Sequence, residues 1–178
     1  MLKSFLQDDN GLTDRLLEFC SSSQSDDVVI NKVAEILSDV RNGGDGAMLK
    51  RTFLYDKVKL GPNQIKVSQN ELEAAKSQLT TSEKESILEA IENVSLFHER
   101  TLPENWSTFN NHGAKVGEKY YPINRVGIYV PGGNVPLIST VVMTVTIAKV
   151  AKVKQIVIVT PPDSEGKIAP QMLAALEI

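Results

Sequence analysis

The stretch from residue 125 to residue 162 reads RVGIYVPGGNVPLISTVVMTVTIAKVAKVKQIVIVTPP, and it decides the fold class. Its flanks, Arg125–Val130 and Lys154–Thr160, are short runs rich in β-branched residues, which is typical of strands buried on both faces of a parallel sheet. Parallel neighbours need a connection of about a dozen residues or more. Pro136–Val150 is the only candidate, so we expect a helix there although its β-branched residues favour a strand. The sequence predicts a right-handed strand–helix–strand unit of an α/β fold.

The loop after the first of these strands is the place where the sequence indicates chemistry. In open α/β sheets, ligands bind outside the carboxyl ends of the strands, and the N-terminus of the following helix attracts a phosphate. The glycines Gly132 and Gly133 allow a sharp turn and leave room for a ligand, while Tyr129 could stack on a planar group. The spacing is neither GxGxxG nor a Walker loop. Two interpretations stay open, a binding loop and a simple tight turn.

The residues before this unit predict helices. Residues 1–25 indicate a short helix and a serine-rich joint, which together are too small to form a core. A second helix is expected to begin at an N-cap of Ser25 and Asp26 and to end at the glycine pair Gly43-Gly44, because its apolar residues recur at helical spacing.

Two further helices are predicted by Ser-x-x-Glu capping boxes, in which each side chain bonds a backbone N–H group of the other residue. The boxes pair Ser68 with Glu71 and Ser82 with Glu85. The segment 104–124 that follows them is expected to be a polar connector dotted with aromatic residues.

Composition and charge exclude several classes of function. The chain is 42% hydrophobic and 23% charged, as soluble globular proteins are. Nineteen basic and twenty-two acidic side chains give a net charge of -3, which argues against nucleic acid or an anionic membrane as the main partner. The single cysteine, Cys20, cannot form an intrachain disulfide, and no apolar run is long enough for a signal peptide or a membrane span. We expect a cytoplasmic protein.

Histidine and cysteine, which often serve acid–base or metal chemistry, are scarce in this chain. His98 and His112 are its only histidines, and neither has a partner at a metal-ligand spacing. The serines and threonines around Ser139 have no partnered base in the sequence. We therefore assign no catalytic residue and no metal ligand.

With these motifs in place, the sequence resembles the histidinol dehydrogenase family, whose zinc-dependent members end histidine biosynthesis. The resemblance is carried by RVGIYVPGG-x-x-PL-x-ST-x-x-M and KQIVIVTPP. It is also carried, in family order, by VAEILSDVRNGGDGAM, FLYDKVKL, IKVSQNELEAA and NVSLFHERTLPE. The likeness covers nearly the whole chain and identifies it as the N-terminal portion of the family's chain.

The resemblance implies a homodimeric, NAD- and zinc-dependent alcohol dehydrogenase that oxidises L-histidinol to L-histidine through histidinal. It implies incomplete Rossmann-like domains with a parallel sheet, preceded by helical segments. Residues 1–25 would form an N-terminal helical arm, and residues 26–128 part of the first α/β domain. Residues 129–178 would form the first half of the NAD-binding Rossmann-like domain, here truncated.

The same resemblance assigns the cofactor-binding residues. Tyr129 matches the tyrosine that touches the dinucleotide, and Pro131, Gly132 and Gly133 match the rest of that block. The family's catalytic residues and zinc ligands lie beyond Ile178, so the chain by itself is expected to bind no zinc and to turn over no histidinol. The alternative is a non-catalytic nucleotide-binding or assembly fragment.

Overall fold

The structure is a computed structural model that describes residues 11–22, 27–132 and 136–178. The chain forms two compact units, Met1–Arg51 and Thr52–Ile178. Its elements, in chain order, are α1 (Leu12–Ser22), α2 (Asp27–Asp56), the 3-10 helix η1 (Pro62–Gln64), α3 (Gln69–Ser77), α4 (Thr81–Thr101), β1 (Trp106–Phe109), β2 (Lys115–Glu118), β3 (Arg125–Tyr129), α5 (Ile138–Val150), β4 (Gln155–Val159) and α6 (Pro170–Glu177). The fold is mixed α/β, and the predicted domain boundaries at residues 25 and 128 stay predictions.

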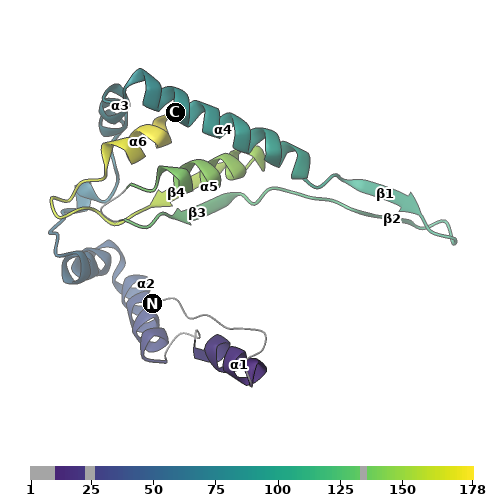
Figure 1. Cartoon of the computed structure of the whole chain (residues 1–178), viewed down its shortest axis with the longest axis horizontal. Coiled ribbons are helices and arrows are strands. Elements are labelled where there is room, and N and C mark those ends of the chain that lie inside the picture. The colour runs from purple at the N-terminus through teal and green to yellow at the C-terminus, as the bar shows by residue number, and fades with distance from the viewer. Residues whose placement is uncertain (1–10, 23–26, 133–135) are drawn as a thin grey trace. The chain divides into compact units, whose positions relative to one another are not determined.

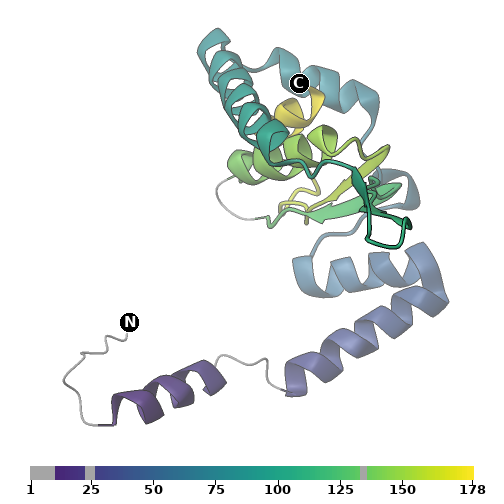
Figure 2. The ribbon, with the colours of Figure 1, turned by 90° about the vertical axis from the view of Figure 1, so that its right-hand side faces the viewer.

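Helix α2 bends sharply at Gly44, where φ is 55° and ψ is -142°, a combination that only glycine adopts readily (Figure 2). The Arg51 guanidinium reaches back to the Glu35 carboxylate at 2.7 Å and also pairs with Asp39. In a straight helix, residues 35 and 51 would lie about 24 Å apart along the axis. The expected helix end at Gly43-Gly44 is confirmed: the backbone leaves helical geometry at Gly44, and two helical segments meet there within α2.

The expected N-cap of this helix, Ser25 and Asp26, lies outside the described residues, and α2 is described from Asp27. The short N-terminal helix is confirmed as α1.

The predicted strand–helix–strand unit is confirmed in the second unit. Strands β3 and β4 pair in parallel, from Arg125 beside Gln155 to Tyr129 beside Val159, and α5 connects them. Helix α5 packs on β3 and on α4, with α6 beside it (Figure 1). Packing on both sides explains why a segment rich in β-branched residues is helical, since tertiary contacts override weak propensity. The handedness of the connection stays a prediction.

The core of this unit lies between α4, α5, α6 and the sheet. Its members are apolar side chains at most 7% exposed: Ile87, Val130, Val141, Val142, Met172 and Ala175. Helix α3 packs on α6 through a second small cluster of Ala75, Leu173 and Ala174.

One capping box is confirmed and the other is wrong. Ser68 and Glu71 cap α3 as predicted. Helix α4, however, is capped by Thr80 with Glu83, two residues before the predicted pair Ser82 and Glu85. The reason is packing: Leu79 contacts both core clusters, so the chain turns directly after it.

Replacing Thr80 with alanine should lower the free energy of unfolding by about 1 kcal/mol, the usual cost of losing an N-cap. The Thr80 hydroxyl accepts the Glu83 N–H at 3.3 Å, while the Thr80 N–H and hydroxyl donate to the Glu83 carboxylate at 2.9 and 2.8 Å. Urea titration measures the loss. Ser82→Ala is the matched control, and an equal loss for both would restore the predicted box.

The same box makes stability depend on pH. The Thr80 N–H, and then its hydroxyl, lower the pKa of Glu83 from its ordinary value. A carboxyl group whose pKa is lower in the folded chain stabilises the fold at pH values above its unfolded pKa. This contribution is lost as the pH falls through the folded pKa.

The connector predicted over residues 104–124 is instead an antiparallel hairpin of β1 and β2, which extends away from the α5 packing (Figure 1). Its turn is built by Asn110, whose side-chain oxygen accepts the N–H groups of His112 at 2.9 Å and Ala114 at 3.0 Å. Gly113 has a φ of 76°, which glycine adopts without strain. The Asn-Asn-His-Gly sequence between two short runs is a signal for such a hairpin turn.

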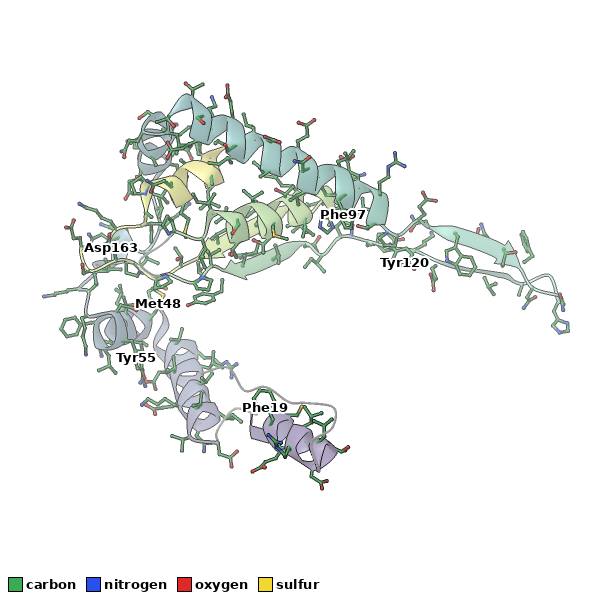
Figure 3. All side chains as sticks on the ribbon, in the orientation of Figure 1. Phe19, Met48, Tyr55, Phe97, Tyr120 and Asp163 are labelled. Atoms are coloured by element: carbon green, nitrogen blue, oxygen red, sulfur yellow. The ribbon has the colours of Figure 1, made fainter. Side chains whose placement is uncertain are left out.

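A polar cluster ties the hairpin to the residues that follow it. The indole N–H of Trp106 donates to the Glu118 carboxylate at 2.9 Å, and the hydroxyl of Tyr120 donates to the same carboxylate. Tyr120 is labelled in Figure 3. The bond from Tyr120, and then that from Trp106, lower the pKa of Glu118. All three side chains are exposed, so this cluster is a surface hydrogen-bond network that links the hairpin to Tyr120. It does not form a buried acid–base pair.

Candidate functional site

Tyr129 lies where the sequence predicts it, as the last residue of β3. Its side chain is 64% exposed, whereas the next residue, Val130, is fully buried. The Val130 N–H donates to the Val159 carbonyl oxygen at 2.9 Å, which extends the parallel pairing one residue past β3. The chain leaves the sheet at Pro131 and Gly132, both exposed. An aromatic ring and a loop thus stand together at the carboxyl edge of the sheet, the usual position for ligands in such folds.

Position 132 requires glycine because a neighbouring loop leaves no room for a side chain there. Its φ is not among the positive glycine values, so the backbone conformation does not demand glycine. A Cβ atom there would lie 2.6 Å from Cγ and 3.2 Å from the carbonyl oxygen of Pro161. The space beside Gly132 that was expected to admit a ligand is therefore filled by Pro161. Gly133 lies outside the described residues.

The loop that carries Pro161 is organised by Asp163 (Figure 3). One carboxylate oxygen of Asp163 accepts the N–H groups of Glu165 and Lys167, each at 2.9 Å, and the Asp163 N–H donates to the Lys167 carbonyl oxygen at 2.8 Å. The Glu165 carboxylate bonds the Lys167 ammonium at 3.0 Å and raises the pKa of Lys167. This loop of residues 161–168 closes on itself beside the Tyr129 edge.

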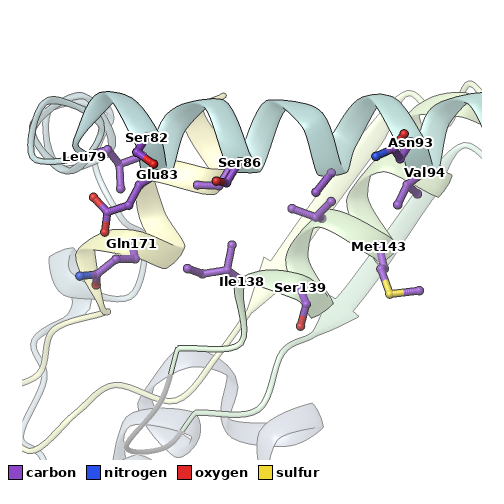
Figure 4. A pocket seen from close by; sticks show the side chains of 13 residues that line it. Leu79, Ser82, Glu83, Ser86, Asn93, Val94, Ile138, Ser139, Met143 and Gln171 are labelled. Carbon is purple, nitrogen blue, oxygen red and sulfur yellow. The ribbon is translucent and has the colours of Figure 1, made fainter.

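A groove of about 610 Å³ lies between α4 and the first turns of α5 and α6 (Figure 4). Its lining is mainly apolar and consists of Leu79, Ser82, Glu83, Ser86, Ile87, Ala90, Asn93, Val94, Ile138, Ser139, Val142, Met143 and Gln171. Among these described residues only Glu83 is ionisable, and its carboxylate is held by Thr80. The groove therefore offers apolar surface and no acid–base pair. The sequence did not indicate it, because its walls come from three helices, α4, α5 and α6, that are far apart in sequence.

The two histidines lie on different elements. His98 lies in the last turn of α4, edge-on to Phe97 with ring centroids 5.2 Å apart, and His112 lies in the hairpin turn. Over residues 11–22, 27–132 and 136–178, no three His, Cys, Asp or Glu side chains are grouped to hold a metal ion. The residues described thus do not fit the zinc that the resemblance implies. In the same ranges, no helix is long and apolar enough to cross a bilayer.

Comparison with known proteins gives one consistent result. The family description of histidinol dehydrogenase matches residues 20–178. The histidinol dehydrogenase of Gloeobacter violaceus is 39% identical over 145 residues, which are 82% of this chain and 33% of that protein. That of Methanothermobacter thermautotrophicus is 36% identical over 92% of this chain and 38% of its own length. The chain thus spans about a third of the length of the curated relatives it matches.

A solved structure agrees with these sequences. The crystal structure of histidinol dehydrogenase from Elizabethkingia anophelis superposes with a TM-score of 0.79 at 32% identity. The match covers 86% of this chain and 34% of that one.

Proposed function

Because this chain belongs to the histidinol dehydrogenase family, we propose that it supplies part of the dinucleotide-binding region of an NAD-dependent oxidoreductase. The reaction is the oxidation of L-histidinol to L-histidine through histidinal. The observation that carries the proposal is the exposed Tyr129 ring beside Pro131 and Gly132, at the carboxyl edge of the parallel strands. In this proposal the enzyme is a cytoplasmic homodimer, and residues 129–178 begin its Rossmann-like NAD-binding domain.

The described residues fit one edge of a dinucleotide. Tyr129 offers a ring face for a planar group, and the positive end of the α5 dipole, at Ile138, favours a phosphate. When bound, NAD accepts a hydride; a base for the hydroxyl proton and an electrophile for its oxygen must come from elsewhere. Zinc would be held by residues that the described part of this chain does not offer.

Dinucleotide binding is tested by titrating the 178-residue chain with NAD in a calorimeter. Tyr129→Ala should raise the Kd about tenfold, since stacking of a base on an aromatic ring contributes about 1–3 kcal/mol. Tyr121→Ala is the matched control, because Tyr121 is 76% exposed and follows the hairpin. Equal affinities for the two variants, or no heat of binding for the unmodified chain, would refute the proposal.

A non-catalytic nucleotide-binding or assembly role is the second candidate. It is favoured by the lack of a grouped metal-ligand set in the described ranges. We expect the chain alone, supplied with zinc, NAD and L-histidinol, to form no NADH above the rate of a sample without protein, because a base and a metal are both required. Absorbance at the NADH band measures this. Zinc-dependent turnover would show that residues taken as structural are catalytic.

A further inference from the structure

Two loops that are about thirty residues apart in sequence meet at the candidate dinucleotide edge. Pro131 and Gly132 leave β3, and Pro161 follows β4. The distances of 2.6 Å and 3.2 Å from a Cβ atom at Gly132 to Pro161 leave no room for a side chain. A distance below 3.0 Å is one that real Cβ atoms essentially never show. The two loops are therefore packed against each other at the backbone of Gly132.

The Pro161 loop is anchored at its far end. Gly166 has a φ of 80°, and a Cβ atom there would lie 3.0 Å from Cδ2 of Leu60 and 3.3 Å from Cγ1 of Val58. Val58 is only 6% exposed, so this end rests on a buried side chain. Between the two ends, Asp163 accepts two backbone N–H groups. The loop that carries Pro161 is thus fixed at both ends, by β4 before Pro161 and by the contact of Gly166 with Val58 after it.

We propose that Pro161 is a positioning residue for dinucleotide binding: its ring fixes Pro131 and Gly132 in the place from which they face the cofactor. The inference rests on the proposed function, because it concerns the same edge beside Tyr129. Proline suits the role, since its fixed φ makes it a stiff support. The glycine at position 132 then serves the contact between the two loops, whereas the sequence alone indicated room for the ligand.

These two explanations of Gly132 predict opposite results for a double substitution. If a ligand fills the space beside Gly132, an added methyl group blocks binding whatever residue stands at position 161. If Pro161 fills it, shortening Pro161 to alanine removes Cγ and Cδ and makes room for the methyl group. The coupling between the two substitutions therefore reports which neighbour matters.

The experiment measures NAD affinity by calorimetry and thermal unfolding by circular dichroism for the full chain and three variants. Gly132→Ala should raise the Kd by about tenfold or more and lower the Tm, and Pro161→Ala should raise the Kd by about threefold with a small change in Tm. The double variant should bind NAD more tightly than Gly132→Ala alone and should recover most of the Tm.

Each result decides between the explanations. A double variant that binds no better than Gly132→Ala would overturn the inference, as would an unchanged Kd in Pro161→Ala. If the unmodified chain binds no NAD, the proposed function fails and the positioning role fails with it, while recovery of the Tm still reports the contact. If Gly132→Ala does not fold, refolding of the double variant supports the contact, and the Kd of Pro161→Ala decides the positioning role.

Discussion

Replacing Val141 with aspartate is expected to abolish folding of the unit Thr52–Ile178. Val141 is fully buried in α5, in the cluster formed with Val130 and Ile87. An unpaired carboxylate in such a place costs several kcal/mol even after relaxation. Whole domains have a free energy of unfolding of only about 5–15 kcal/mol, and a domain with a small core has less. The cost of this substitution should therefore exceed the free energy of unfolding of the unit.

The measurement is amide chemical-shift dispersion in a proton–nitrogen NMR spectrum, supported by urea titration. Met143→Asp is the matched control, because Met143 lies two residues further along the same helix and is 54% exposed. The control should keep the native spectrum. A dispersed spectrum and a cooperative urea transition for Val141→Asp would show that the cluster is not the core of this unit.

The parallel pair and its connecting helix were predictable from the sequence, because topology limits the choices. Two short runs rich in β-branched residues imply a parallel pair, and a parallel pair requires a long connection, so residues 136–150 had one assignment despite their propensity. The hairpin around Asn110 was missed for the opposite reason. Its strands, Trp106–Phe109 and Lys115–Glu118, are exposed at every position, so no buried alternation marks them.

In the candidate site, too, the features set by local sequence were predictable and those set by tertiary contacts were not. Tyr129 could be placed near the strand end from local sequence alone, since the run of β-branched residues stops before Pro131. The predicted burial of this strand on both faces is wrong, because exposed and half-buried residues alternate along β3 and Tyr129 is exposed. The contact of Gly132 with Pro161 could not be predicted, because it depends on how two loops meet after the sheet has formed. The prediction of the α4 capping box was wrong for a similar reason. Thr80 and Ser82 each precede a glutamate by three residues, and the core contact of Leu79 selects between them.

Gly44→Ala is expected to straighten helix α2 over residues 27–51. At a φ of 55° and a ψ of -142°, alanine is strained by roughly 1–3 kcal/mol, whereas in a helix it is about 1 kcal/mol better than glycine. Opposing this change are the ion pairs of Arg51 with Glu35 and Asp39, whose carboxylates are about half exposed. Exposed pairs contribute about 1 kcal/mol or less each, so the backbone preference should prevail.

Spin labels at the exposed positions Ser38 and Lys50 measure this change, with Cys20 replaced by serine in every sample. In a straight helix these positions are about 18 Å apart along the axis, and the label distance in Gly44→Ala should lengthen toward that of a continuous helix. Gly46→Ala is the control, since a Cβ atom at Gly46 meets nothing within 4 Å and its φ is not positive. It should leave the distance unchanged. If the two variants gave the same distance as the unmodified chain, the ion pairs of Arg51 would be the stronger determinant of the bend, and Arg51→Ala would then have to release it.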